Sequence, residues 1–485
     1  MHPILEQQHN ATRREFLTQT GSGVGLAALA TLLGQESRAA EAKPTVESQV
    51  LAGLPHHAAK AKRIIYMTQS GAPSHVDLFD WKPNLHKLRN TNLPPSVQMG
   101  QRLTTMTAGK RQAIMSAEFK FHQYGQRGTW LSELLKYTGE VSDDICFIKS
   151  MNTEAINHAQ AMTLCQTGSQ FLGRPSMGSW LSYGLGSLNQ DLPTYVVLVS
   201  QMTDHTCGQI VSENYYGSGF LPSKHQGVRF RGGVDPVLYL SSPPGVNAAV
   251  RRGQLDDLAR LNELKLREMG DAEIATRISQ YELAFRMQSA IPEVADVSGE
   301  PQHIYDMYGK YSKTPGTYAA NCLLARRLLE RGVRFVQLFH IGWDQHGNLP
   351  KQLRHQCDHT DQPSAALLKD LKQRGLLDDT LIVWGGEFGR TVFCQGDLTD
   401  PARGRDHHGR CFTIWTAGAG IKPGIVGETD DFAYNIVRDP VHIHDLQATI
   451  LHQFGIDHKR LTFKFQGRHY RLTDVDGNVV KGALA

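Results

Sequence analysis

Three clusters of carboxylate, imidazole and guanidinium side chains lie in the last third of the chain. The candidate metal ligands among them are Asp344, His346, Glu387, Asp406, His407 and His408. Oxygen and imidazole donors without a thiolate suit divalent ions such as Zn, Mn, Fe, Mg or Ca. Asp344 and His346 are two residues apart, a spacing that puts both side chains on one side of an extended segment. The clusters therefore predict a divalent metal site of unknown metal identity.

The same clusters allow other arrangements. Arg390 and Arg405 could be counter-ions in a buried network of carboxylate–imidazole and arginine–carboxylate pairs. If a metal is bound, these guanidinium groups and His158 could instead hold the non-reacting oxygens of an anionic substrate, because arginine offers a planar fork suited to such groups. Glu387 is then either a ligand or a base.

Apolar, β-branched runs flank the clusters. The runs that begin at Phe335 and Leu381 end in the first and second clusters, and the third cluster opens the run from Cys411 to Trp415. Continuous apolar runs are typical of parallel strands buried on both faces, and ligands bind beyond the carboxyl ends of such strands. We therefore expect the clusters to converge at one edge of a sheet.

Two earlier strands also end in polar loops. The run from Arg63 to Thr68 leads into a Gly/Pro loop that carries Ser70, Ser74, His75 and Asp77. This loop is either part of the site, with Ser70 or Ser74 as a possible nucleophile, or a capped turn. The run 145–149 leads to His158, at the predicted start of a helix that ends at Thr167-Gly168. A helix N-terminus favours anions, so His158 is a candidate for contact with an oxyanion.

Alternating helices and strands predict the architecture. Helical periodicity at 319–331 and 363–375 precedes two of the strands, 195–199 is a further strand, and 131–137 a short helix. Repeated helix-then-strand units predict a mostly parallel sheet with right-handed crossovers, in an α/β protein.

Two further segments lie outside this pattern. Residues 82–128 fit a surface insertion, and residues 240–290 fit a helical cover. His442 and His444 would point to different sides of a helix, which favours core or capping roles.

The N-terminus has the features of an export signal. Arg13 and Arg14 precede a short Gly/Ala-rich apolar run and a region of small residues near Ala42. This pattern predicts a twin-arginine signal peptide at 1–42, with the Tat machinery as a partner, a linker at 43–60 and a single domain at 61–485. The product would be periplasmic or secreted, without stable membrane insertion.

The overall charge argues against nucleic-acid binding. The net charge is only +4, and the sequence contains no basic cluster.

Several motifs together resemble the domain-of-unknown-function 1501 family. They are the twin-arginine leader, Ser-Gly-Ala-Pro-Ser-His-Val-Asp, Trp-Asp-Gln-His-Gly, Gly-Gly-Glu-Phe-Gly-Arg-Thr and Gly-Arg-Asp-His-His-Gly, and the match covers nearly the whole mature chain. The family is similar to the alkaline phosphatase and sulfatase superfamily. That resemblance implies a three-layer α/β/α fold and an anionic ester substrate, with a sulfated or phosphorylated glycan as one candidate.

The resemblance carries over unevenly to the site. Asp344, His346 and either His407 or His408 are counterparts of the superfamily's first metal site. At the second site this chain has Ser70 and Glu387-Phe388 where acidic and histidine ligands are usual, so His75 or Asp77 would have to complete it. The nucleophile position falls on His158, not on the cysteine that becomes formylglycine. His158 could therefore be a ligand or a nucleophilic imidazole.

These observations lead to two main hypotheses. The first is an exported metal-dependent hydrolase of phosphate or sulfate esters, sulfatase-like but without a formylglycine cysteine. Its candidate catalytic residues are His158, Glu387, Arg390 and Ser70. The second is a non-catalytic exported protein whose degenerate site binds an anion or glycan or stabilises the fold. A metal-dependent mutase or transferase is a third hypothesis, because the same site would serve it.

Overall fold

The computed structural model describes residues 50–201, 211–232, 236–237, 240–243 and 245–485. The predicted leader lies outside these residues. The described chain divides into two compact units, one of residues 242–278 and the other of residues 50–241 with 279–485. The helices expected around 240–290 are present as α9 (Ala248–Met269) and α10 (Ala272–Ala295). No helix among the described residues combines the length and the apolar character needed to cross a membrane.

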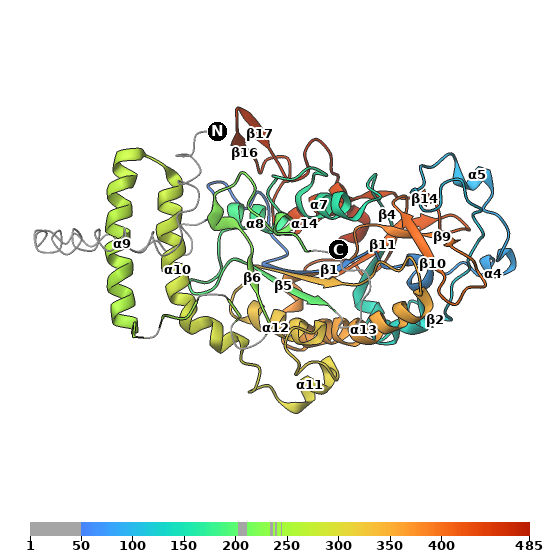
Figure 1. The fold of residues 1–485 in the computed structure, drawn as a ribbon, viewed down its shortest axis with the longest axis horizontal. Helices are drawn as coiled ribbons and strands as arrows, with labels where there is room; N and C mark the ends of the chain where they lie inside the picture. Colours follow the sequence, from blue (N-terminus) through green and yellow to red (C-terminus); the bar gives the residue numbers. More distant parts are fainter. Residues whose placement is uncertain (1–49, 202–210, 233–235, 238–239, 244) are drawn as a thin grey trace, which may run out of the picture. The chain divides into compact units, whose positions relative to one another are not determined.

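A nine-stranded sheet forms the centre of the larger unit (Figure 1). Its strand order is β12-β4-β11-β8-β1-β7-β5-β6, and β15 also pairs with β4. The strands are β1 (Arg63–Ser70), β4 (Ile145–Asn152), β5 (Tyr195–Gln201), β6 (Val228–Phe230), β7 (Phe335–Ile341), β8 (Thr380–Gly385), β11 (Phe412–Ala417), β12 (Gly424–Val426) and β15 (Val441–His442). All neighbours are parallel except that β11 is antiparallel to both β4 and β8. The predicted mostly parallel α/β fold is confirmed.

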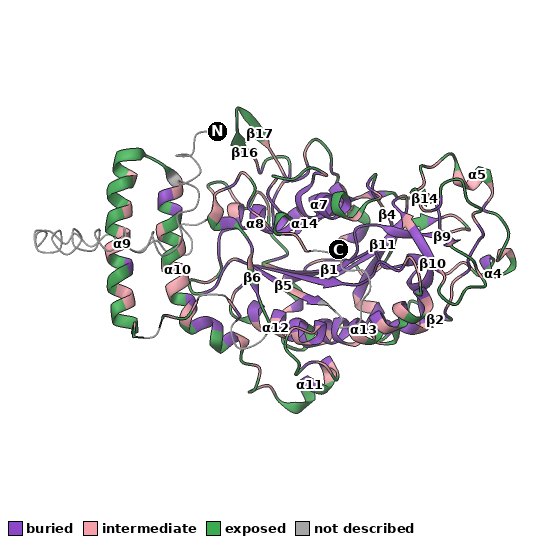
Figure 2. Cartoon of the chain, in the orientation of Figure 1, coloured by how far each residue is buried: buried purple, intermediate pink, exposed green. Residues whose placement is uncertain are grey.

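Helices cover both faces of this sheet, which gives the larger unit three layers (Figure 1). On one face lie α12 (Tyr318–Glu330) and α13 (Leu349–Gln373), and on the other α7 (His158–Thr167), α8 (Met177–Leu185) and α14 (Ile443–Gln453). Alternate β1 side chains enter separate cores, Ile65 and Met67 on the first side, Ile64 and Tyr66 on the second. The sheet is therefore buried on both faces, as the continuous apolar runs predicted (Figure 2).

The antiparallel direction of β11 explains how the third cluster reaches the carboxyl edge of the parallel strands. Phe412, the first residue of β11, pairs with Met151 near the end of β4. Residues just before β11 therefore lie beside residues just after β4. They form β10 (Gly404–His408), which pairs with β9 (Gly389–Gln395) in a hairpin outside the main sheet.

Smaller elements complete the fold. They are α3 (His75–Leu78), α4 (Leu85–Leu88), α5 (Pro95–Gln98), β2 (Phe121–Tyr124), β3 (Thr129–Ser132), α6 (Lys136–Glu140), α11 (Gln302–Tyr308), β13 (Glu428–Thr429), β14 (Ile436–Arg438), β16 (Phe463–Phe465) and β17 (Arg468–Tyr470).

Two predicted helices differ from the observed ones. The segment 131–137 begins as strand, because β3 pairs with β2 up to Ser132, and only then turns helical. Helix α13 begins at Leu349 and contains Pro363, so the predicted start at that proline is wrong. The capping role expected at the last helix is confirmed, since the His442 side chain caps α14.

Candidate metal centre

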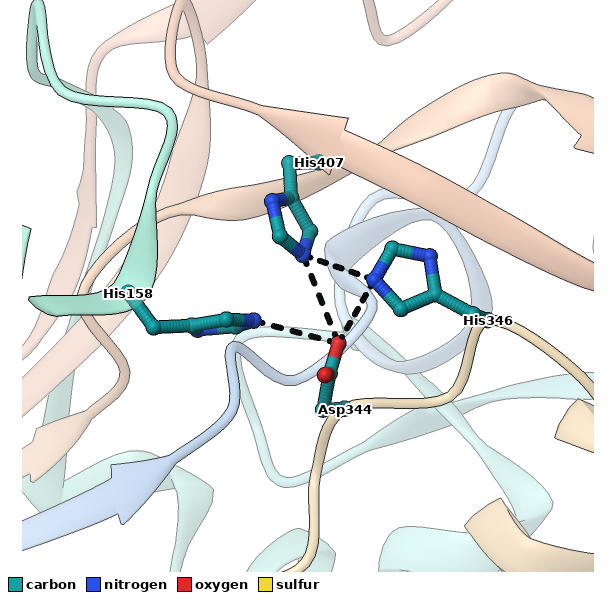
Figure 3. A group of neighbouring side chains, drawn as sticks. All are labelled: His158, Asp344, His346 and His407. Atoms are coloured by element: carbon teal, nitrogen blue, oxygen red, sulfur yellow. Dashed lines mark hydrogen bonds and ion pairs between the residues drawn. The ribbon is translucent and has the colours of Figure 1, made fainter. Parts of the chain in front are cut away.

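Side chains from three separate segments converge beyond the carboxyl ends of the strands. His158, Asp344, His346 and His407 each offer one ligand atom, and these atoms lie within 4.8 Å of one another. Figure 3 shows the three imidazoles and the carboxylate pointing toward a common centre. No other group of three or more histidine, cysteine, aspartate or glutamate side chains in the described part of the chain has this arrangement.

The distances in this group are those of a ligand shell. Asp344 Oδ1 lies 3.1 Å from His158 Nε2, 3.0 Å from His346 Nε2 and 3.4 Å from His407 Nε2. The Nε2 atoms of His346 and His407 are 2.8 Å apart. Ligands at about 2.0–2.1 Å from a tetrahedral ion are themselves separated by roughly 3.3 Å. The four groups therefore need only small adjustments to surround one ion.

Local structure explains each position. Asn157 caps the first turn of α7 by accepting a hydrogen bond from the Ala159 N–H, at 3.1 Å, which places His158 at the first helical position. Asp344 and His346 follow β7 in the loop that begins at Gly342, where φ is 120°. His407 lies in β10. The side chains are 8–19% exposed, so the centre is largely buried.

The second nitrogen of every imidazole is bound to an oxygen acceptor. Nδ1 of His158 lies 2.5 Å from Glu387 Oε1, that of His346 lies 2.6 Å from Gln395 Oε1, and that of His407 lies 2.8 Å from the Ile156 carbonyl. These contacts require Nδ1–H donors. They therefore leave the Nε2 lone pairs directed at the centre, as in histidines that bind metals.

Electrostatics at the centre favours a cation. Burial by itself would raise the pKa of Asp344, but its contacts with three histidines and the charge of Arg390 hold it far below its usual range. Burial lowers the pKa of His407 to about 4, so this imidazole is neutral at pH 7. Burial opposes charge on His158, but its contacts with Asp344 and Glu387 outweigh burial and raise its pKa. The negative charges of Asp344 and Glu387 that stabilise positive charge on His158 would also stabilise a metal ion beside its Nε2 atom.

The donor set fits a divalent transition ion. Three imidazoles and one carboxylate oxygen converge, and the Nε2 atoms of His346 and His407 lie 2.8 Å apart, close enough to share one ion. Nitrogen donors of this kind suit Zn, Mn or Fe better than Mg or Ca, which prefer oxygen. His158, Asp344, His346 and His407 could thus hold one ion.

Two of the predicted ligands, Asp406 and His408, face away from this centre. Alternation along β10 directs them to the side opposite His407. Asp406 accepts hydrogen bonds from the hydroxyls of Thr104 and Thr107. His408 contacts the Tyr434 carbonyl at 2.7 Å, and burial lowers its pKa to about 3. Both side chains hold the hairpin against its surroundings and are not part of the converging group.

The predicted ligands in the loop after β1, His75 and Asp77, also bind partners outside the metal centre. Asp77 forms a fully buried ion pair with Arg405, with Nε–Oδ2 at 2.7 Å and Nη2–Oδ1 at 3.0 Å, and accepts a hydrogen bond from Ser74 at 2.5 Å. His75 contacts the Ala433 carbonyl at 3.0 Å, and burial lowers its pKa. These contacts hold the turn after β1 against its surroundings. Ser74 lies at the N-cap position of α3, but its side chain makes no capping hydrogen bond, so the predicted capping role is not observed.

The two candidate anion-binding arginines are both buried and bound to carboxylates and backbone carbonyls. Arg390 is fully buried and binds Asp344 Oδ1 at 2.6 Å, the Ala72 carbonyl at 3.0 Å and the Gly71 carbonyl. Arg405 binds Asp77 and four backbone carbonyls. Each guanidinium is thus paired with a carboxylate, as in the counter-ion arrangement.

Ser70 and Glu387 are predicted site residues that are not among the converging ligands. Ser70 is 2% exposed, and its hydroxyl has no hydrogen-bond partner among the described residues. Glu387 lies behind His158, on the Nδ1 side of the ring. Sequence reasoning missed Gln395 and the Ile156 carbonyl, which the hairpin and the β4–α7 loop place behind the other two histidines. Neither carried a recognisable signal, because their partners lie far away along the chain.

Comparison with known proteins gives one family and several remote structures. The family described as "Protein of unknown function (DUF1501)" matches residues 61–484. No curated protein matches the sequence. Solved structures with detectable similarity include a sulfatase from Pseudoalteromonas sp. (12% identity, 82% of this chain and 68% of that chain, TM-score 0.33). An alkaline phosphatase from the Antarctic bacterium TAB5 (9%, 81% and 97%, 0.29) and a phosphonate monoester hydrolase from Silicibacter pomeroyi (13%, 72% and 71%, 0.30) are others. Similarity at this level carries no activity over to this chain.

Proposed function

The chain belongs to the DUF1501 family of proteins of unknown function, and we propose that it is a metal-dependent hydrolase of phosphate or sulfate esters. The observation that supports this proposal is the convergence of three Nε2 atoms on Asp344 Oδ1, with each Nδ1 bound to an oxygen on the far side. Such a preorganised donor set is typical of a metal ligand shell, in which second contacts fix the orientation of each histidine.

His158, Asp344, His346 and His407 would hold the ion. When bound, a divalent ion supplies Lewis-acid polarisation of an ester oxygen and lowers the pKa of a coordinated water. The chain contributes a semi-enclosed setting for that chemistry. The Phe388 ring packs against His158 and His407, at centroid distances of 4.8 and 4.6 Å, and keeps water from that side of both imidazoles.

The charge of the centre favours an anionic substrate. The two carboxylates, Asp344 and Glu387, outnumber the single guanidinium of Arg390 by one charge. A divalent cation would therefore leave a net positive charge in a largely buried site, where Coulomb attraction is stronger than in water. A phosphate or sulfate group would complement that charge without a free arginine.

The formylglycine route of sulfatases has no counterpart at this centre. His158 occupies the candidate nucleophile position, and its Nε2 faces Asp344 rather than solvent. Cys165 lies on the same helix but is fully buried, and burial raises the pKa of its thiol well above the usual value. Neither side chain is therefore placed as a free nucleophile.

A second function is favoured by one specific observation. Four protein groups are enough to fill a tetrahedral shell by themselves, and closed shells of this kind are typical of structural metal sites. Under this alternative the ion stabilises an exported, non-catalytic protein. The two functions differ in whether the metal-loaded protein hydrolyses an ester.

Measuring the metal content and then screening for ester hydrolysis distinguishes the hydrolase from the structural metal site. Protein purified without chelator should contain about one transition-metal ion per chain by plasma mass spectrometry, and His346→Ala/His407→Ala should contain none. His469→Ala, at an exposed histidine, is the matched control and should keep its metal. Wild type should hydrolyse aryl phosphate or aryl sulfate esters, lose this activity with a chelator, and regain it with one divalent metal.

Each outcome decides a point. A well-folded, metal-free wild type that takes up no added ion would end the metal proposal. Stoichiometric metal without turnover of either ester class would establish the structural alternative instead.

We also propose that the protein works outside the cytoplasm, on the strength of the leader. Replacing Arg13 and Arg14 by lysine should keep the protein in the cytoplasmic fraction, because the twin-arginine pathway depends on that pair. Unchanged export of the double variant would remove this part of the proposal.

A further inference from the structure

The carboxylate of Glu387 is fixed on the far side of His158 from the metal centre. Its Oε1 lies 2.5 Å from His158 Nδ1 and accepts a hydrogen bond from the Gly71 N–H at 3.1 Å, and its Oε2 lies 3.3 Å from the same Gly71 nitrogen. The side chain is 1% exposed. Glu387 therefore touches the centre only through the imidazole of His158.

Gly71 couples this carboxylate to the rest of the site. The Gly71 N–H donates to Glu387, and its carbonyl accepts from Arg390, which also binds Asp344. At φ +110°, a Cβ on Gly71 would lie 2.5 Å from the Asp344 nitrogen. The backbone around Gly71 thus holds Glu387 and Asp344 at a set separation, with His158 between them.

The three histidines differ in the acceptor behind them. His158 has a carboxylate, His346 the amide oxygen of Gln395, and His407 the backbone carbonyl of Ile156. A charged acceptor forms a shorter and stronger hydrogen bond than a neutral one, and it makes the imidazole a stronger ligand. His158 should therefore donate most strongly of the three.

We propose that Glu387 is a positioning residue that orients His158 and strengthens its bond to the metal ion, and that it is neither a ligand nor a general base. This inference depends on the metal-binding part of the proposed function but not on its ester chemistry. It also implies one ion per chain, because a carboxylate engaged with His158 and Gly71 is not available to a second ion.

Metal titration tests the role directly. Purified wild-type protein, stripped of metal and titrated with Co²⁺ or Zn²⁺ against a competing chromophoric chelator, should bind one ion. Glu387→Gln keeps the shape of the side chain but loses its charge, and should bind the same single ion about 10- to 100-fold more weakly. The Co²⁺ absorption spectrum should change with it, a change that a purely structural role for Glu387 would not produce.

Gln395→Glu tests the same link between the charge of the acceptor behind a histidine and the affinity for the ion, but it adds a charge instead of removing one. It places a charged acceptor behind His346, and should tighten binding of the ion and shift the Co²⁺ spectrum. Gln395 is only partly buried, so this variant keeps the proposal testable if Glu387→Gln fails to fold.

The results separate failure of this inference from failure of the proposed function. Equal affinity and an unchanged spectrum in folded Glu387→Gln and Gln395→Glu would overturn the positioning role while leaving the metal site intact. Two ions in wild type, one of them lost in Glu387→Gln, would make Glu387 a ligand. A wild type that binds no ion would remove the metal site itself.

Discussion

At the scale of single residues, adjacent side chains in β10 differ sharply in surroundings. His407 faces Asp344, whereas His408 contacts the Tyr434 carbonyl and Gln101 on the other side of the hairpin. Both are histidines with similar neighbours in sequence, so only the pleat of the strand separates a candidate ligand from a structural residue. Asp77 is a similar case, because its two oxygens are used by Arg405 and not by the metal centre.

Replacing Asp77 by alanine should separate stability from metal binding. The change leaves the fully buried Arg405 guanidinium without its counter-ion, which should lower the free energy of unfolding by about 3–5 kcal/mol. Metal content per folded chain should be unchanged. Urea unfolding and plasma mass spectrometry on the same samples measure both quantities.

His346→Ala is the matched comparison. Its side chain is 19% exposed, so its loss should remove the metal at a smaller cost to the stability of the metal-free protein. If Asp77→Ala loses metal while remaining folded, Asp77 acts at the metal centre after all.

At the scale of elements, the turn after β1 is the junction between the sheet and the site. β1 lies between β7 and β8, whose ends lead to Asp344 and Glu387, and Gly71 contacts both residues immediately beyond the strand. The antiparallel β11 supplies the other side of the site, because it brings β10 to the same edge. The site is thus assembled from the ends of several strands.

Gly71→Ala should disrupt this junction. A Cβ would lie 2.5 Å from the Asp344 backbone nitrogen, at a φ of +110° that alanine rarely adopts. We expect a loss of roughly 3 kcal/mol or more in stability, together with weaker metal binding, because both strain and backbone overlap must be relieved.

Gly396→Ala is the control for backbone strain alone. Gly396 has φ +93°, but no atom lies within 4 Å of the position that a Cβ would occupy, so its replacement should cost only about 1–2 kcal/mol and spare the metal. Equal effects of the two substitutions, in unfolding and in metal titration, would show that the contact with Asp344 is unimportant.

At the scale of the whole molecule, buried neutral histidines make stability depend on pH. His225 is an example outside the converging group: its Nδ1 lies 3.0 Å from the Ser182 hydroxyl, and burial lowers its pKa to about 4. In the unfolded chain its pKa returns to about 6.5. A histidine whose folded pKa is depressed contributes stability above pH 6.5 that is lost as the pH falls toward 4.

His225→Asn should reduce that dependence. Asparagine can keep the contact with Ser182 but does not titrate. Wild type should lose about 2 kcal/mol more than the variant between pH 7 and pH 5, by linkage at this one group. Urea midpoints at several pH values measure the difference, and parallel pH profiles would show that His225 is not neutral and buried as described.

The sequence by itself determined the six longer strands of the sheet, the start and end of α7, the family and the order of the polar clusters, but not the short strands β6, β12 and β15. These depend on neighbours along the chain: β-branched runs for the strands, Asn157 and Gly168 for the ends of α7, and contiguous motifs for the family. They could therefore be predicted.

Only the tertiary structure decided which side chains of those clusters meet. In the folded chain His158 contacts Asp344, and His407 rather than His408 faces the metal centre. Arg390 and Arg405 form ion pairs with aspartates, and Gln395 lies behind His346. Each of these pairings joins segments that are distant in sequence, and each depends on which face of a strand or turn a side chain occupies. Local periodicity determines neither the pairing of distant segments nor the face that a side chain occupies. Both are decided when the sheet, its crossing helices and the β9–β10 hairpin pack together.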